Sequence, residues 1–400
     1  MHRVVFRGGS VFDGTGSAVR RADVAIEDGR FAAVGSELTG DEIVHVPGLT
    51  LLPGLFNCHV HVVGCLPDPT ARLKTPFSLQ FYQALPILDH LLASGITSAR
   101  DCAGADLGVK KALEDGLISG PRLQISINAI SQTGGHIDGW TPSGECVSEY
   151  YVPHPGRPHP VADGPDELRT LVRTLVRAGA EVIKICTTNG GVWPREEYLT
   201  PHFRDDELAV IMAEARAARV PVMSHACGAE GVKSAVRAGV RSIEHGTYLD
   251  REAVDLMAER GTWLVPTLVR FHGMLDRPEV AARIPQAMID DARRVADASA
   301  ESFALALEAG VRIAMGTDMH GGEFLDELGY MHKFGMRPEA VLEASTRSAA
   351  QLLGWDEDLG TIEPGKRADL VVVDGDPFDF WALKGAVKAV YQDGVQVSAS

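Results

Sequence analysis

Two histidines near the end of an apolar segment are the first residues in this sequence that could bind a metal ion. The segment begins at Leu51 and contains Phe56, and His59 and His61 follow it two positions apart. Side chains at positions i and i+2 of a β-strand point to the same face, so both imidazoles should converge at one strand end. Imidazole nitrogen is a common ligand of Zn²⁺. Because this spacing also arises by chance, the rest of the chain must supply further ligands.

More polar residues lie inside or directly after other apolar segments. Lys184 lies inside the segment Val182–Cys186, and His225, His245 and Asp318 each follow one. If these segments are parallel strands of one barrel, their carboxyl ends surround a single mouth, where catalytic groups collect. Four imidazoles, one carboxylate and one lysine at that mouth predict a metal site.

Lys184 is unusual in an apolar strand, because an ammonium group is costly to bury without a partner. One interpretation is a neutral amine that reacts with CO₂, so that the resulting carbamate bridges two cations. The alternative is a lysine that reaches solvent or pairs with a carboxylate. Asp318 likewise has an alternative role as a helix cap before Met319.

The intervening sequence predicts the elements that position these residues. Short apolar segments alternate with helical segments between Pro53 and Trp355, a pattern typical of a (β/α)₈ barrel. The expected strands are Leu51–Phe56, Ile96–Arg100, Arg122–Ala129, Val182–Cys186, Val220–Ser224, Ser242–Glu244, Thr262–Thr267 and Arg312–Met315. The expected helices are Pro86–Ala93, Gly108–Asp115, Pro165–Ala178, Asp205–Ala218, Ala229–Ala238, Arg251–Arg260, Ile284–Ala309 and the region Pro338–Gly354.

Both ends of the chain are rich in β-type sequence. Asp28-Gly29 and Asp393-Gly394 lie between apolar residues and predict hairpin turns. We expect the two ends to pair in one sheet. The predicted fold is therefore α/β, a TIM-like (β/α)₈ barrel of residues 54–355 with a small β-sandwich built from residues 1–53 and 356–400.

Composition excludes several classes of partner. The chain has 400 residues and a net charge of −16, from 38 Lys and Arg against 54 Asp and Glu, so nucleic acid and anionic membranes are not expected partners. The first residues lack the apolar core of a signal peptide, so none is expected, and no apolar run is long enough to span a bilayer. The six cysteines form no C-x-x-C pair. Reduced thiols in a cytoplasmic protein are the expectation.

Two segments exceed an ordinary connection, residues 62–83 and 131–164. Long loops in a barrel usually form lids or binding loops at the strand ends. The alternative is a surface insertion or a contact between subunits, and a homo-oligomer is expected.

Taken together, these motifs resemble the amidohydrolase superfamily, in its imidazolonepropionase-like and prolidase-like branch of metal-dependent hydrolases. The resemblance covers nearly the whole chain. It rests on Leu52-Pro53-Gly54-Leu55, His59-Val60-His61, Lys184, His225, Ile243-Glu244-His245-Gly246, Gly316-Thr317-Asp318 and the segment Gly360–Val371.

The resemblance implies two divalent metal ions, expected to be zinc, bridged by a hydroxide and by Lys184 carboxylated with CO₂. The hydroxide would attack the carbonyl carbon of an amide or peptide bond. Asp318 would act as general acid and base, passing the proton to the leaving nitrogen. By position, the ligands of the more buried ion are His59, His61 and Asp318, and those of the more exposed ion are His225 and His245.

Further residues are candidates for contacts with the reacting substrate. Tyr248 could donate to the oxyanion, with packing as the alternative, and His136 resembles a substrate-contacting histidine of prolidase-like members. The implied substrate is a dipeptide or N-acyl amino acid with a free carboxylate. Candidates to bind that carboxylate are Arg270 and His320, with Arg195 and Arg157 as competitors.

Other functions remain open at this stage. A cyclic amide or imidazolone hydrolase, or a deaminase with one metal, is the alternative among enzymes. Lys184 argues against the deaminase, since such members generally lack the bridging lysine. A catalytically silent binding or assembly protein is the alternative from another class, although such relatives tend to lose metal ligands.

Overall fold

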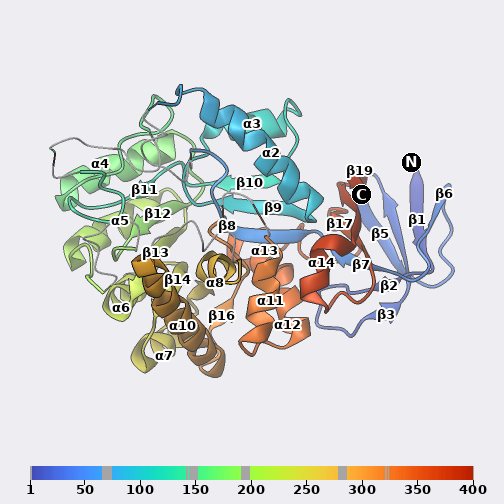
Figure 1. Ribbon diagram of the computed structural model, residues 1–400. Helices are drawn as coiled ribbons and strands as arrows, with labels where there is room; N and C mark the ends of the chain where they lie inside the picture. The colour runs from blue at the N-terminus through green and yellow to red at the C-terminus, as the bar shows by residue number, and fades with distance from the viewer. Residues whose placement is uncertain are drawn as a thin grey trace.

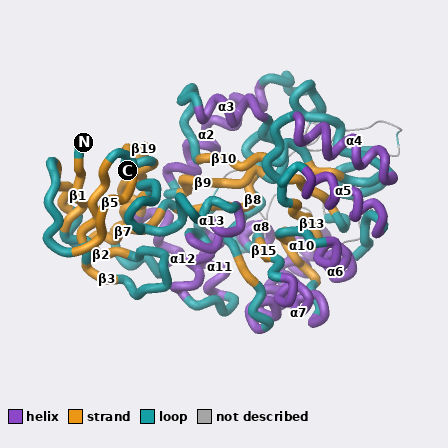
Figure 2. The backbone as a smooth tube through the Cα atoms, turned by 180° about the vertical axis from the view of Figure 1, so that it is seen from behind, coloured by secondary structure: helices purple, strands orange, loops and turns teal. Residues whose placement is uncertain are grey.

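Parallel strands alternate with helices through the middle of the molecule (Figures 1 and 2). The structure is a computed structural model that describes residues 2–64, 74–140, 143, 152–190, 199–277, 286–319, 322 and 324–399. The predicted α/β class is confirmed.

The parallel strands form two sheets. One has the order β10-β9-β8 and the other the order β11-β12-β13-β14-β15-β16. The backbone N–H of Cys58 in β8 donates to the carbonyl of Met315 after β16 (2.8 Å), so the first and last of these strands lie side by side. The strands are β8 (Leu55–Val60), β9 (Ile96–Asp101), β10 (Arg122–Ile125), β11 (Ala129–Ile130), β12 (Ile183–Cys186), β13 (Val222–Gly228), β14 (Ser242–Tyr248), β15 (Trp263–Val265) and β16 (Arg312–Ile313).

Two predicted strands are divided in the structure. The expected strand Arg122–Ala129 is split into β10 and β11 because Ile127 takes a left-handed conformation (φ 69°). The expected strand Leu51–Phe56 belongs to two sheets, since β7 (Leu49–Pro53) ends just before Gly54 and β8 begins just after it. A Cβ at Gly54 would lie 2.2 Å from the Thr97 Oγ1, so only glycine fits this crossing point. Both halves are buried, which explains the uninterrupted apolar sequence.

Helices cover the parallel strands, mostly where the sequence predicts them. The predicted helix Pro86–Ala93 begins earlier, because Pro86 lies inside a helix rather than at its start. The region Pro338–Gly354 forms two helices interrupted at Thr346, and three short helices, α8, α11 and α14, were not predicted. The helices are α2 (Leu79–Ala93), α3 (Leu107–Glu114), α4 (Gly164–Arg177), α5 (Asp205–Ala217), α6 (Ala229–Ala238), α7 (Arg251–Arg260), α8 (Val269–Leu275), α10 (Gln286–Glu308), α11 (Asp326–Lys333), α12 (Pro338–Ala344), α13 (Arg347–Leu353) and α14 (Phe380–Ala386).

The two ends of the chain meet in one sheet, as predicted, and lie to one side of the parallel strands (Figure 1). Strands β7 and β17 pair antiparallel, with Leu52 opposite Val371. This sheet has the order β19-β18-β17-β7-β2-β3, and a second has the order β5-β4-β1-β6. The remaining strands are β1 (Arg3–Arg7), β2 (Ser10–Val11), β3 (Arg20–Arg21), β4 (Asp23–Glu27), β5 (Arg30–Gly35), β6 (Glu42–His45), β17 (Leu370–Asp374), β18 (Val387–Gln392) and β19 (Val395–Ala399).

Both predicted hairpins are present in these terminal sheets. Asp28 (φ 50°) and Gly29 (φ 75°) join β4 to β5, and Asp393 (φ 49°) and Gly394 (φ 73°) join β18 to β19. Two successive left-handed residues are the conformation that a tight hairpin turn requires. Hydrophobic residues from the two sheets, including Phe6, form a core separate from that of the parallel strands. The division into two domains stays a prediction.

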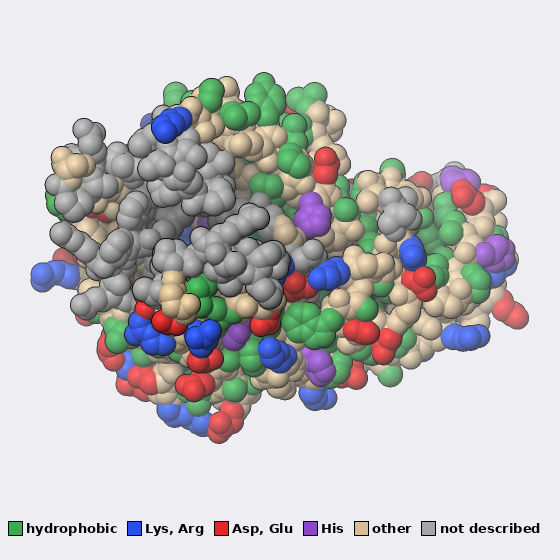
Figure 3. Space-filling view, in the orientation of Figure 1, with side chains coloured by type: hydrophobic (Ala, Val, Ile, Leu, Met, Phe, Trp, Pro, Cys, Tyr) green, Lys and Arg blue, Asp and Glu red, His purple; other side chains and the backbone are tan. Residues whose placement is uncertain are grey.

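Hydrophobic side chains gather on the surface over α2 and α3 (Figure 3). Among them, Leu79 is 40% exposed, Tyr82 66% and Leu107 42%. Exposed apolar surface of this kind is common where proteins associate, and the expected homo-oligomer stays a prediction. Among the described residues, no helix has the length and apolar character needed to cross a membrane.

Candidate metal centre

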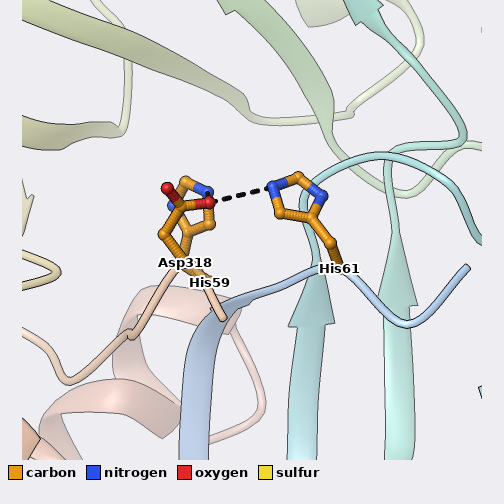
Figure 4. A group of neighbouring side chains, drawn as sticks. All are labelled: His59, His61 and Asp318. Atoms are coloured by element: carbon orange, nitrogen blue, oxygen red, sulfur yellow. Dashed lines mark ion pairs between the residues drawn. The ribbon is translucent and has the colours of Figure 1, made fainter. Parts of the chain in front are cut away.

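The side chains of His59, His61 and Asp318 converge at the carboxyl ends of β8 and β16 (Figure 4). Their ligand atoms all lie within 4.8 Å of one another. The Nε2 of His59 is 3.4 Å from the Oδ1 of Asp318, and the Nε2 of His61 is 3.1 Å from the same oxygen. The backbone N–H of Asp318 donates to the carbonyl of His59 (2.8 Å), which fixes the carboxylate beside the strand that carries both histidines.

The hydrogen bonds of the Nδ1 atoms of His59 and His61 indicate which ring nitrogens carry a proton. The Nδ1 of His61 is 2.9 Å from the carbonyl oxygen of Ala103, and the Nδ1 of His59 is 2.8 Å from the Oε2 of Glu244. Because both oxygens can only accept, each Nδ1 carries a proton. In neutral rings the two Nε2 lone pairs would therefore face a carboxylate oxygen, an arrangement that a cation, either a proton on Nε2 or a bound metal ion, would stabilise. Two imidazoles and a carboxylate suit Zn²⁺.

The ionisation of these residues agrees with a site that favours positive charge. Although burial opposes it, the neighbouring Cys102 and Asp318 raise the pKa of His59 to about 10. Burial would also raise the pKa of Asp318, but its hydrogen bonds to His59 and His61 hold that pKa well below the usual range. The carboxylate of Asp318 is therefore ionised and available as a ligand or base.

A second pair of histidines lies beside the first group. The ring of His245 in β14 is 5.0 Å from that of His59 and 4.6 Å from that of His225 in β13, measured between centroids. Both strands continue past these residues, beyond the ends that the sequence predicted. Burial and the nearby charge of Lys184 hold the pKa values of His225 and His245 well below their ordinary value. The rings are therefore neutral, which is the form that binds metal ions.

Lys184 lies on a strand that pairs with the strand carrying His225. It is in β12, opposite Ala129 and Met223, and is only 4% exposed. Within the described part of the chain, no carboxylate oxygen lies within 4.0 Å of its Nζ. Its charge lowers the pKa of His59, His225 and His245, which places the amine near all three rings. These observations argue against both alternative interpretations of Lys184, in which its side chain reaches solvent or pairs with a carboxylate.

Three residues of this site take left-handed backbone conformations. They are His245 (φ 74°), Thr267 (φ 53°) and Asp318 (φ 54°). Such angles are uncommon for residues other than glycine and cluster at functional sites. At His245 the unusual angle has a visible result, since Glu244 and His245 are adjacent on one strand yet both reach His59. The Oγ1 of Thr267 in turn lies 2.7 Å from the Nδ1 of His245 and orients that ring.

The structure also places the other residues that the sequence singled out. The ring of His136 stacks on that of His225 at 4.0 Å, so it lies beside the metal ligands. Tyr248 is half-buried at the end of β14, where burial and the charge of Cys227 raise the pKa of its phenol. The Sγ of Cys227 is 3.9 Å from the Nε2 of His225.

The candidate arginines have different surroundings. The Nε of Arg270 in α8 lies 3.5 Å from the Oδ2 of Asp318, so this side chain belongs to the site. Arg157 is fully buried, and its guanidinium donates to the carbonyls of Gly104 and Val152 and to Gln80, which makes it a poor candidate for binding substrate. His320 and Arg195 lie outside the described residues.

Sequence analysis missed the residues that hold the ligands in place. Glu244 and Thr267 each bond a ligand histidine, and Arg100 pairs with Glu244 (2.7 Å). The sequence did indicate a role for Arg100 and Glu244, because a charged residue inside an apolar strand needs a partner when it is buried. Gly190 was also missed. A Cβ there would lie 2.6 Å from the Cε1 of His136 and 2.7 Å from the Cε1 of His225.

Comparison with known proteins identifies the class to which this site belongs. Residues 50–397 match the model of the amidohydrolase family. The chain is a member of that family, and the resemblance inferred from its motifs is confirmed. Membership, together with the relatives described next, supports a hydrolase that acts on amide bonds.

Three proteins are similar to this chain over nearly its whole length. Ochratoxinase from Aspergillus niger is 34% identical over 396 residues, covering 93% of this chain and 81% of its own. A Xaa-Pro dipeptidase solved with methionine in its active site is 30% identical, with a TM-score of 0.89, covering 99% of this chain and 100% of its own. A prolidase solved with N-methylphosphonate-L-proline is 32% identical, with a TM-score of 0.88 and full coverage of both chains.

Proposed function

We propose that this protein is a binuclear, zinc-dependent hydrolase that cleaves the amide C–N bond of a dipeptide or N-acyl amino acid carrying a free carboxylate. The observation that carries the proposal is the convergence of His59, His61 and Asp318, whose Nε2 and Oδ1 atoms face one another and form a donor set that suits Zn²⁺. The neutral imidazoles of His225 and His245 beside this group support a second ion.

In this proposal, His59, His61 and Asp318 would hold one ion and His225 and His245 would hold the other. Lys184, carboxylated by CO₂, would supply a bridging ligand. The buried amine has no carboxylate partner among the described residues, which supports this role. Two bound ions would polarise the scissile carbonyl and lower the pKa of the attacking water.

The chain's own groups then position and move the protons. Asp318 is ionised, and we propose that it accepts the proton of the attacking water and returns it to the leaving nitrogen. Tyr248 stays protonated because burial raises its pKa, so its phenol can donate to the oxyanion. The stacking of His136 on His225 supports the proposed contact between His136 and the substrate.

The proposed substrate class draws on the relatives as well as on the site. The similar Xaa-Pro dipeptidase contains methionine, and the similar prolidase contains a phosphonate derivative of proline. Both compounds carry a carboxylate and are about the size of an amino acid or a dipeptide. Among the described residues, Arg270 lies beside Asp318 and is the proposed partner of such a carboxylate, whereas the guanidinium of Arg157 is buried and donates to backbone carbonyls.

The proposal extends to the fold. We infer that the parallel strands form one (β/α)₈ barrel, with β10 and β11 counted as a single strand. At one side, the hydrogen bond from Cys58 to Met315 joins the two parallel sheets. At the other side, the N–H of Gly104, after β9, donates to the carbonyl of Ile127, between β10 and β11 (3.1 Å). We also propose the two-domain division at Gly54 and residue 356.

A metal analysis with a substrate screen tests the function. Purified protein, supplied with Zn²⁺ and bicarbonate, is assayed for metal content and against a library of dipeptides and N-acyl amino acids. We expect two zinc ions per chain and release of a free amino acid. Absence of bound metal together with absence of metal-stimulated turnover would refute the proposal, and ammonia release from a cyclic substrate would favour the deaminase alternative.

Lys184→Ala tests the bridge separately. Removing the amine removes the proposed side-chain bridge between the two ions, so we expect metal content to fall from two ions toward one and turnover to be largely lost. A small carboxylic acid such as formate should restore part of the activity by replacing the carbamate. Two ions and full turnover in the variant would overturn the bridging role.

A further inference from the structure

A buried polar network lies beneath His59 and crosses between two strands that are not neighbours. Arg100 in β9 donates from its Nη2 to the Oε1 of Glu244 in β14 (2.7 Å), and Ser242 donates to the same oxygen (2.6 Å). Arg100 also donates to Ser242 and to the carbonyl of Cys58. The other carboxylate oxygen of Glu244, Oε2, is left for the Nδ1 of His59 (2.8 Å).

Burying these charged groups costs free energy, and hydrophobic side chains could fill the same space. Arg100 is 2% exposed and Glu244 is fully buried. Replacing a buried ion pair with well-packed hydrophobic residues is often neutral or stabilising, so such a pair is weak evidence for a role in stability. The hydrogen bond from His59 to Glu244 connects this network to the metal centre, which suggests what it does.

Glu244 is better placed as a hydrogen-bond partner than as a metal ligand. Glu244, His59 and Cys102 also bring their donor atoms within 4.8 Å of one another. However, one oxygen of Glu244 already accepts two hydrogen bonds and the other accepts from His59. The thiol of Cys102 is directed at the backbone carbonyls of Cys58 and Arg100.

We propose that Glu244, with its charge balanced by Arg100, is a positioning residue that keeps the His59 proton on Nδ1 and presents Nε2 to the metal ion. The inference rests on the proposed function, since it concerns the same metal site. Partners that orient a ligand histidine in this way raise its affinity for metal, and their loss typically costs about 10–100-fold in metal binding or activity.

Glu244→Gln tests this proposal because a carboxylate has two oxygens that accept hydrogen bonds, whereas an amide has one accepting oxygen and one donating NH₂ group. Arg100 and Ser242 are donors, so they hold the amide oxygen, and the amide NH₂ then faces the Nδ1 of His59. The ring must accept that bond, which moves its proton to Nε2 and blocks the metal-binding position. We expect the folded apo-variant to bind Zn²⁺ about 10–100-fold more weakly in competition with a chromophoric chelator. Excess zinc should restore turnover.

Asp369→Asn is the matched control. Asp369 is also buried and paired with an arginine, Arg122, but it lies between the terminal sheet and β10. We expect this variant to melt at a lower temperature with unchanged zinc affinity. Equal zinc affinity in folded Glu244→Gln and wild type would overturn the proposal, as would equal loss of zinc affinity in both variants.

Glu244→Asp covers the case in which the glutamine variant does not fold. It keeps the charge beside Arg100, but the shorter side chain cannot also reach His59, so weaker zinc binding is again expected. If neither variant folds, the role of Glu244 is structural and the proposal is wrong. Failure of the proposed function gives a different result, because the wild type itself would then bind no zinc.

Discussion

The imidazole rings of His136 and His225 stack nearly parallel, at an interplanar angle of 10°, and Gly190 lies against both. There is no room for a side chain at this position, since even a Cβ would approach both rings closer than van der Waals contact allows. Gly190 therefore determines how far the two rings can extend toward the metal centre.

Gly190→Ala should displace one or both rings and lower kcat/KM by about 100-fold, because errors of about 1 Å in catalytic geometry have effects of this size. The measurement is steady-state kinetics on the best dipeptide substrate, with circular dichroism to show that the fold is retained. Gly385→Ala is the control, since a Cβ at Gly385 meets nothing within 4 Å. Equal activity in the two variants would contradict the role given to Gly190.

At the residue scale, spacing predicted which ligands could meet but not how they are held. His59 and His61 follow the alternation of a strand, so their convergence was predictable. The joint approach of Glu244 and His245 to His59 was not, because adjacent strand residues should point to opposite faces. The left-handed angle at His245 that overrides this rule has no signature in the sequence, unlike the Asp-Gly turns of the hairpins.

Helix α8 connects several parts of the site even though it is short. Thr267 precedes it and bonds His245, and Arg270 in its first turn pairs with Asp318. The carboxylate of Glu327, from α11, accepts from the N–H groups of Leu268 (2.9 Å) and Val269 (2.7 Å) at the start of the helix. A helix of this length is not stable alone, so tertiary contacts fix it.

Stability should depend on pH through Glu327. Burial raises its pKa from 4.5 to about 8, against the opposing effect of the two backbone N–H groups. Between these values the folded protein keeps a proton that the unfolded chain has lost, so the free energy of unfolding falls as pH rises through this window and levels off above it.

Glu327→Gln, which cannot ionise, should lack this contribution. Denaturant unfolding of both proteins from about pH 5 to about pH 8 should show the wild type losing stability relative to the variant. Parallel profiles would mean that Glu327 titrates near its ordinary pKa. The dependence of α8 on a distant carboxylate also explains why sequence periodicity did not predict this helix, whereas the longer amphipathic helices α4 and α6 were predicted almost to their ends.

At the scale of the whole molecule, the candidate metal centre joins the first parallel strand to the last. His59 and His61 belong to β8 and the residue after it, whereas Asp318 follows β16. An ion bound by all three would hold these distant parts of the chain together. Their sequence separation also explains why the ligand set could be inferred only by assuming a barrel, which brings the strand ends to one place.

Removing the metal should therefore lower the melting temperature. An ion present at 100 times its Kd stabilises the fold by about 2.7 kcal/mol, provided that it binds only the folded state. Scanning calorimetry before and after chelation, with zinc added back, measures the effect. Asp318→Ala should show a much smaller zinc-dependent shift, and an identical melting temperature with and without metal in the wild type would argue against an ion at this site.

The pairing of β7 with β17 has a consequence for biosynthesis. Leu49–Pro53 leave the ribosome long before their sheet partner Leu370–Asp374 is made. At translation rates of about 5–20 residues per second, the early strand waits for tens of seconds with one edge unpaired. Nascent chains stalled before β17 should thus expose that edge to proteases and chaperones, even if the parallel strands have already folded.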